Sequence, residues 1–272
     1  MMGKVALVLF LPLLGGLAWF CQRGGDGKSA EADLVVAGLG GFRGIIAEVV
    51  WFRADRLQDE GRYSEMAQLA NILTTLEPHT PEVWAYAAWN LAYNISVMMP
   101  TAEDRWRWVE AGLKLLRDDG LRLNPSSPEL YREIAWLFLS KIGGGIDDAS
   151  SLYMKKWGEQ VDAAGGDWTG LKMDKSLMDY IDRDYGQQDW RGPKASALYW
   201  AHLGLSMRPL GAVRAELRQI VYQTLMVASI EDARFAPRAL RAMQEADVEA
   251  PSAGLGDLIQ RFSAKFSLSI KD

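Results

Sequence analysis

The sequence predicts an all-α protein in which antiparallel helix pairs stack into an α-solenoid-like array, preceded by one N-terminal transmembrane or signal-anchor helix. Three observations lead to this prediction. An uncharged apolar run lies near the N-terminus, helix-start signals recur without the alternation typical of strands, and a motif repeats at an offset of 47 residues. The chain has 272 residues, of which 49% are hydrophobic, and this composition excludes a wholly disordered protein.

The N-terminal segment is the first expected element. Residues 5–21 form an uncharged apolar run of 17 residues, close to the lower limit for a membrane-spanning helix. We expect this run to remain as an anchor, because the bulky Trp19 and Phe20 stand where signal cleavage or a lipobox at Cys21 needs small residues. A cleaved signal and a lipoprotein modified at Cys21 are the alternatives. The body is then expected on the extracytoplasmic, periplasmic side of the inner membrane, after a glycine-rich flexible linker at residues 22–34.

Helix-start signals mark the rest of the chain. Thr80-Pro81-Glu82 and Ser127-Pro128-Glu129 each place a capping hydroxyl before a proline at the first helical position. Thr101 with Asp104 resembles a capping box. The expected helices span residues 40–60, 64–77, 81–98, 102–118, 128–141, 147–163, 174–184, 193–207, 211–229, 236–247 and 255–267.

An internal repeat is the strongest signal in the sequence. Residues 78–89 and 125–136 share two prolines, a glutamate, an aliphatic residue, an aromatic residue and a final Ala-Trp at one offset of 47 residues. Residues 47–80 also fit the 34-residue register of a tetratricopeptide (TPR) repeat, with Ala54, Gly61 and Ala70 where the two helices would touch. The expected organisation is TPR-like repeats over 35–165, an irregular acidic connector over 166–192, and a C-terminal helical region with a degenerate repeat over 193–272.

Several motifs also resemble those of a known group of proteins. Gly40-Gly41-Phe42-Arg43-Gly44, Arg105-Trp106-Arg107-Trp108 and Asp189-Trp190-Arg191 look like motifs of a family of bacterial TPR-containing proteins with a short N-terminal hydrophobic segment and no established activity. The stretch at residues 88–96 is similar as well, and the resemblance covers roughly residues 38–205. It implies the helical-repeat fold and the membrane segment, and it supplies no catalytic residue.

The repeat geometry predicts a partner-binding groove on the face formed by the first helix of each pair. Inward-facing positions of the first three units carry aromatic residues among charged ones, which is typical of surfaces that bind peptides or partner helices. In the alternative arrangement, later helices fold back and bury these tryptophans. The candidate groove residues are Trp51, Asp55, Trp89, Tyr93, Arg132 and Trp136.

The composition excludes several classes of function. A net charge of −5 lacks the basic excess of a general nucleic-acid binder. One cysteine and two histidines exclude a thiolate zinc cluster and disfavour a Ser-His-Asp apparatus, so neither a metal nor a cofactor is expected. Glu133 and Asp55 are conceivable as an acid–base pair across the groove, although nothing in their spacing requires it.

The sequence therefore favours a non-enzymatic, membrane-tethered, TPR-like scaffold that holds a protein or peptide partner in the bacterial cell envelope. One alternative is a cell-envelope glycan-binding module or enzyme that uses Trp stacking and Asp/Glu chemistry in the helical groove. Another alternative is a subunit of a larger membrane assembly, docked to other chains through residues 35–50.

Overall fold

The computed structural model describes residues 42–145 and 147–268 of the chain. Throughout these residues the regular elements are helices and no strand occurs, so the all-α prediction is confirmed. In this part of the chain no helix combines the length and the apolar character needed to cross a membrane. The predicted anchor at residues 5–21 and the predicted linker at 22–34 lie outside the described residues.

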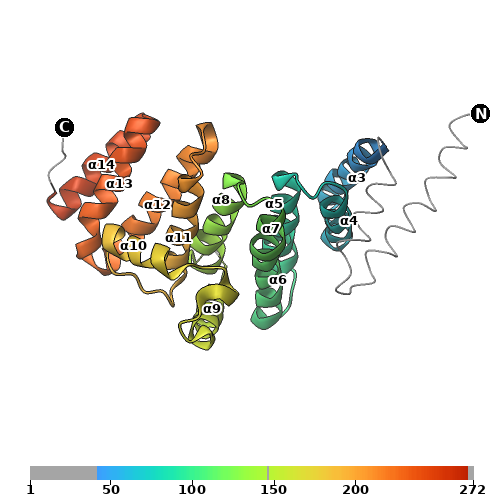
Figure 1. Cartoon of the computed structure of the whole chain (residues 1–272), viewed down its shortest axis with the longest axis horizontal. Coiled ribbons are helices and arrows are strands. Elements are labelled where there is room, and N and C mark those ends of the chain that lie inside the picture. Colours follow the sequence, from blue (N-terminus) through green and yellow to red (C-terminus); the bar gives the residue numbers. More distant parts are fainter. Residues whose placement is uncertain (1–41, 146, 269–272) are drawn as a thin grey trace, which may run out of the picture.

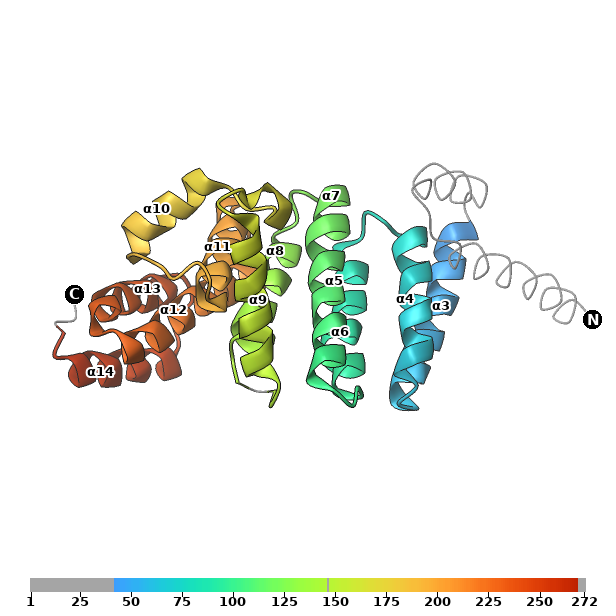
Figure 2. The ribbon, with the colours of Figure 1, turned by 90° about the horizontal axis from the view of Figure 1, so that it is seen from below.

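The helices form an elongated array that follows the order of the sequence (Figure 1). At one end, α3 (Phe42–Asp59) packs against α4 (Tyr63–Leu76), and a turn of three residues makes the two helices antiparallel. At the other end, α13 (Ala236–Glu249) packs against α14 (Ala253–Phe266). Seen from below, the helices of the first half stand side by side, with each one contacting its neighbours in the row (Figure 2).

Three helices in the middle of the array continue into π-helical turns, in which backbone hydrogen bonds join residues five apart. The N–H group of Ser96 bonds to the carbonyl oxygen of Leu91, and 47 residues later the N–H group of Gly143 bonds to that of Phe138. The helix and π-turn of the first repeat copy therefore recur in the second at the offset of the sequence motif. These elements are α5 (Pro81–Trp89) with η1 (Asn90–Ile95), α6 (Ala102–Lys114) with η2 (Leu115–Gly120) and α7 (Leu121–Leu123), and α8 (Pro128–Trp136) with η3 (Leu137–Ile142).

The two repeat copies are also held by equivalent hydrogen bonds. The indole Nε1 of Trp84 donates to the carbonyl oxygen of Pro78 at 2.9 Å. The hydroxyl of Tyr131, which is the equivalent residue, donates to the carbonyl oxygen of Pro125 at 2.8 Å. In both copies an aromatic side chain of the first helical turn therefore donates a hydrogen bond to a proline carbonyl oxygen in the loop that leads into the helix.

The helix caps follow the prediction at two positions and depart from it at a third. Thr101 caps α6, and Ser127 caps α8 by accepting a hydrogen bond from the N–H group of Leu130. Thr80 makes no side-chain cap, which corrects the expectation from its sequence. The reason is that the N–H group of Val83 bonds to the backbone carbonyl of Thr80 at 3.1 Å, and this tighter turn leaves the hydroxyl without the expected donor.

Small side chains lie where helices cross. Ala54 and Ala88 expose only 0% and 2% of their surface, as the repeat pattern predicts. A Cβ atom on Gly112 of α6 would lie 2.9 Å from the carbonyl oxygen of Ala88. Because a larger side chain at such a point would push the helices apart, these residues set the spacing of the array.

The second half of the chain is also helical, and the segment expected to be irregular contributes to it. Within residues 166–192, α10 (Lys175–Tyr185) presents Asp182 to the loop that follows, where its carboxylate accepts hydrogen bonds from the N–H group of Gln188 and the indole of Trp190. Asp182 therefore holds the loop that follows α10 against the end of that helix. The other elements are α9 (Ser150–Ala164), η4 (Trp168–Leu171), α11 (Pro193–Ser206), α12 (Gly211–Glu231) and η5 (Ala233–Phe235).

One large hydrophobic core runs from α5 to α14. Trp157 and Trp200 are among the largest fully buried side chains, which accounts for part of the unusual tryptophan content. A smaller cluster, which includes Val50 and Leu73, joins α3 to α4. This continuous packing holds the inner faces of the helices in fixed relation to one another, and those faces carry the candidate site.

Candidate functional site

Three of the six predicted groove residues line one cavity of about 240 Å³. Trp89 comes from the end of α5, whereas Arg132 and Trp136 come from α8. The opposite wall is formed by α12. Trp89 remains 44% exposed, so the later helices do not bury it. The remaining lining residues are Glu133, Glu216, Gln219 and Ile220.

Tyr93, the fourth predicted residue, does not line this cavity but contacts Trp89, which does. Its ring stacks on that of Trp89, with the centroids 4.0 Å apart. Its hydroxyl forms a 2.7 Å hydrogen bond with Ser140 Oγ, a residue exactly one repeat further along the chain. Burial raises the pKa of Tyr93 well above its ordinary value, so the phenol is neutral at physiological pH.

The other two predicted residues lie on α3, away from this cavity. The Trp51 ring packs edge to face against Tyr86 of α5, with the centroids 4.9 Å apart, and is half-buried. Asp55 lies one turn further along α3, and its side chain lies outside the described part of the structure. The structure therefore brings together the groove residues predicted from the second and third repeat units. It places Trp51 instead in a contact between the first and second units.

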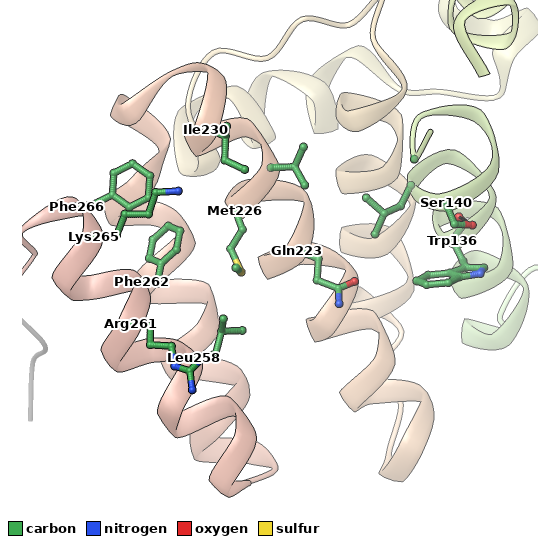
Figure 3. A pocket seen from close by; sticks show the side chains of 13 residues that line it. Trp136, Ser140, Gln223, Met226, Ile230, Leu258, Arg261, Phe262, Lys265 and Phe266 are labelled. Atoms are coloured by element: carbon green, nitrogen blue, oxygen red, sulfur yellow. Dashed lines mark hydrogen bonds between the residues drawn. The ribbon is translucent and has the colours of Figure 1, made fainter. Parts of the chain in front are cut away.

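A second and larger cavity of about 510 Å³ adjoins the first at Trp136, which lines both (Figure 3). In Figure 3, Met226 lies between Trp136 on one side and Phe262 on the other. We call the two cavities together the inner groove. Its larger part is lined by Trp136, Leu139, Ser140, Gly144, Gln223, Met226, Val227, Ile230, Leu258, Arg261, Phe262, Lys265 and Phe266.

The walls of the inner groove come from four helices that are not consecutive in the chain. Lining residues belong to α5, α8 with η3, α12 and α14, whereas α11 and α13 contribute none. Arg132, in the middle of α8, pairs with Glu216 in the second turn of α12, whereas Gly144, which follows η3, and Ile230, at the C-terminal end of α12, both line the larger cavity. The inner helices α8 and α12 therefore run in the same direction.

The two ends of the inner groove differ in charge. At the smaller cavity, Arg132 pairs with Glu133 at 2.5 Å and with Glu216 at 2.9 Å, so these lining residues carry a formal charge of −1. Burial raises the pKa of Glu133. At the larger cavity, the charged lining residues are Arg261 and Lys265, with a formal charge of +2.

The cations of the larger cavity differ in their partners. Arg261 pairs with Asp257 on the exposed side of α14 at 2.6 Å. The ammonium group of Lys265 lies 5.6 Å from the centroid of the Phe266 ring, and within the described residues it has no salt-bridge partner. Lys265 is therefore available to a carboxylate of a ligand.

A buried polar cluster supports the groove wall formed by η3. Lys141 follows Ser140, and its ammonium group bonds to Asp147 at 2.6 Å; both side chains are only 4% exposed. Asp147 also accepts hydrogen bonds from the Tyr153 hydroxyl at 3.0 Å and from Arg105 at 3.3 Å. Burial alone would raise the pKa of Asp147, but the hydrogen bonds from Lys141 and a backbone N–H group hold it well below its usual range. Because these groups do not reach the groove, the cluster positions the wall instead of contacting a ligand.

The described residues contain no group of His, Cys, Asp and Glu arranged to hold a metal ion. Neither histidine lines the groove. His79 is exposed and its Nδ1 lies 3.2 Å from the carbonyl oxygen of Leu123, whereas His202 packs beside Tyr180 and Tyr185. The chemistry of the groove is therefore that of apolar and aromatic contact with charges at its two ends.

Sequence reasoning missed the part of the inner groove formed by α12 and α14. The spacing of Gln219, Gln223, Met226 and Ile230 follows one helical face, but so does the spacing of buried residues on the same helix. No aromatic repeat marks this half, so the sequence alone gave no means of deciding which of the two faces is open.

Together, the fold and the site define an all-helical protein whose inner helices form an open, largely apolar groove. No family model matches the chain, no curated protein is significantly similar to it, and no solved structure resembles it significantly. The function is therefore inferred from the geometry of the groove.

Proposed function

We propose that the protein is a membrane-tethered, TPR-like scaffold of the bacterial cell envelope that holds a protein partner in the inner groove. The observation that carries this proposal is the convergence of the inner helices on one open groove, with Trp136 at its centre. A large exposed apolar groove on a well-packed array is typical of a surface that another molecule covers.

The architecture supports a TPR-like description in two ways. In such arrays the first helix of each pair lines the concave face and the second helix covers the other side. Here α8, α12 and α14 line the groove, whereas α11 and α13 pack behind them. Buried small residues at helix crossings, such as Ala54 and Gly112, are consistent with the same packing.

The membrane tether is proposed from the apolar run at residues 5–21. A retained anchor whose N-terminus stays in the cytoplasm would place the array on the extracytoplasmic face of the membrane, where the groove would be open to other envelope proteins. Analysis of the N-terminus by mass spectrometry after cell fractionation tests this part. An intact Met1 in the membrane fraction supports the anchor, whereas a chain that begins after Cys21 or carries lipid on Cys21 contradicts it.

The lining of the larger cavity favours a protein partner. Aromatic residues, methionine and arginine are enriched in the centres of protein interfaces, and Trp136, Met226, Phe262 and Arg261 supply all of these. Val227 and Ile230 expose 43% and 71% of their surface, although both are aliphatic. A partner that covers them would remove this apolar surface from water, which is favourable.

Site-specific photocrosslinking in the full-length chain tests the proposal. A photoreactive phenylalanine analogue replaces Val227 in the groove or, as a matched control, Val248 on α13, which is 83% exposed and does not line the groove. In membranes of the native host, we expect one discrete adduct from position 227 and none from position 248. Equal labelling from both positions, or none from position 227, would contradict a partner in the groove.

A glycan-binding function is the second candidate, and the smaller cavity favours it. Trp89 and Trp136 flank Arg132 and two glutamates there, and sugars bind by stacking on indoles beside such polar groups. Tryptophan fluorescence of the full chain, titrated with soluble peptidoglycan fragments, tests this alternative. Saturable quenching that Trp89→Ala abolishes and Ile230→Asp leaves intact would support a glycan ligand. Unchanged fluorescence would reject it.

A further inference from the structure

One whole face of α12 lies in the inner groove without an internal partner helix. The face carries Glu216, Gln219, Gln223, Met226 and Ile230, which follow one another at intervals of three or four residues. Glu216 and Ile230 are 14 positions apart, which corresponds to about 21 Å of α-helix, or about four turns. The C-terminal half of this face is apolar, with Met226 and Ile230 beside the exposed Val227, whereas Glu216, Gln219 and Gln223 give the N-terminal half hydrogen-bonding groups. An exposed apolar surface of this kind is typical of one that another molecule covers.

The helices on either side of α12 turn matching faces into the same groove. On α14, the lining residues Leu258, Phe262 and Phe266 recur every four residues. On α8 and η3, Arg132, Trp136 and Ser140 recur at the same interval. Three helices therefore border the groove with ridges of side chains at helical spacing, and ridges of this kind accept the ridges of a further helix.

Charge gives the groove a direction along its length. The end lined by Glu133 and Glu216 favours a basic side chain, because Arg132 supplies one positive charge against two glutamates and leaves a formal charge of −1. The end lined by Arg261 and Lys265 favours acidic side chains, and Lys265 is available to one of them. Between these ends the lining is apolar, apart from Gln219 and Gln223 on α12 and Ser140 of η3, whose hydroxyl is bonded to the Trp136 carbonyl oxygen and to Tyr93.

We propose that the occupant of the inner groove is an amphipathic α-helix of a partner protein, about four turns long. Its apolar face packs on α12 between Trp136 and Phe262, its acidic side chains pair with Arg261 and Lys265, and a basic side chain at its other end meets Glu133 and Glu216. This inference rests on the proposed scaffold function and adds the class of structure that the scaffold recognises.

Two crosslinks from α12 measure the conformation of the occupant. Gln219 and Ile230 are both exposed and both line the groove, and the 11 residues between them correspond to about 17 Å of helix. The photoreactive analogue replaces each residue in turn in the full-length chain, and mass spectrometry locates the attachment points in the partner. A helical occupant places these points about 11 residues apart, whereas an extended peptide places them about 5 residues apart.

The charge assignment has its own test with a matched control. Lys265→Glu is expected to lower the crosslinking yield at Ile230 by about fivefold, because it replaces an attraction at the groove rim with a repulsion. Lys155→Glu changes the net charge equally on α9, where Lys155 is 71% exposed and outside the groove, and should leave the yield unchanged. Equal losses in both variants would overturn the charge assignment.

The outcomes separate the two proposals. A spacing of about 11 residues within a segment that carries apolar residues every three or four positions supports the helix. A spacing of about 5 residues, a lipid adduct, or an adduct to a second copy of this chain overturns it. If position 227 crosslinks to a protein while positions 219 and 230 give the extended spacing, the scaffold function stands and only the helix fails. No adduct at any of the three positions overturns both.

Discussion

Replacing Lys141 by methionine tests how much the buried ion pair behind the groove wall contributes to the stability of the fold. Methionine fills much of the volume of the lysine stem, but it removes the nearer of the two cations that pair with Asp147, the other being Arg105. Breaking a buried pair by removing one partner costs about 3–5 kcal/mol, because the remaining charge is uncompensated. Asp147 keeps three other partners, so we expect the lower end, about 3 kcal/mol. These partners are the Tyr153 hydroxyl at 3.0 Å, the Ala149 N–H group at 3.0 Å and Arg105 Nη1 at 3.3 Å.

Thermal unfolding followed by circular dichroism measures this loss. In a folded region of this size, 1 kcal/mol corresponds to about 2–4 °C, so Lys141→Met should lower the Tm by about 6–12 °C. Lys155→Met is the control, because Lys155 is 71% exposed and its one ion pair, with Glu159, is long at 3.8 Å. We expect this control to shift the Tm by less than about 2 °C.

The double variant Lys141→Met with Asp147→Leu separates a lost charge from lost packing. It leaves no uncompensated carboxylate, but the Tyr153 hydroxyl and the Ala149 N–H group lose their acceptor, so its loss of stability should be smaller than the sum of the losses in the two single variants. The pH dependence gives a second check. The lowered pKa of Asp147 means that the pair contributes fully above the ordinary carboxyl value of 3.8 and that this contribution is lost as the pH falls towards the folded-state value. A Lys141→Met variant as stable as the wild type, or a double variant whose loss equals the sum of the two single losses, would refute this reasoning.

Three further predictions concern packing and pH. Gly112→Ala should destabilise the fold by about 1–2 kcal/mol, because the new methyl group would lie 2.9 Å from a backbone oxygen. Gly256→Ala is the control: its methyl group would face open space, so the variant should stabilise the helix by about 0.5–1 kcal/mol. Equal shifts of the two variants in urea unfolding would contradict this prediction. Burial raises the pKa of Tyr185 to about 12, so the contribution of this residue to stability is lost as the pH rises from 10 towards 12. Tyr185→Phe should reduce this loss of stability at alkaline pH. Identical stability profiles of the variant and the wild type across that range would contradict this prediction. Hydrogen bonds from Arg214 and a neighbouring arginine lower the pKa of Glu249 to about 2, so this contribution is lost as the pH falls from 4.5 towards 2. Arg214→Ala should cost about 0.5–1 kcal/mol at neutral pH and less in acid, and a pH-independent loss would argue against the pair.

Local chemistry made the helix boundaries predictable. The helix expected at residues 128–141 spans α8 and η3, from Pro128 to Ile142, because Ser127 caps its first turn and Gly143 ends it. The repeat was visible because the same loop and first helical turn recur with the same prolines. Capping residues and prolines determine the backbone only within a few residues of their own position, so their effect can be predicted directly from the sequence.

Contacts between distant residues were harder to predict. The position of Trp89 beside Arg132 and Trp136 follows from the repeat register, but Glu216 joins them only because α12 stacks on α8. The π-helical turns carry no sequence signature, and the cap at Thr80 was lost to a tighter backbone turn. Each of these three features depends on how neighbouring segments pack. The residue type at a single position does not encode that packing.

The π-turns of η1 and η3 also bear on the register of the array. A π-turn joins residues five apart where the α-helix joins residues four apart, so the residues that follow it are turned about the helix axis relative to an uninterrupted α-helix. Both repeat copies carry such a turn at the same place, 47 residues apart. Tyr93 in η1 and Ser140 in η3 occupy equivalent positions, and their hydroxyls meet at 2.7 Å. An equal shift in both copies therefore preserves the match between them at the point where they touch.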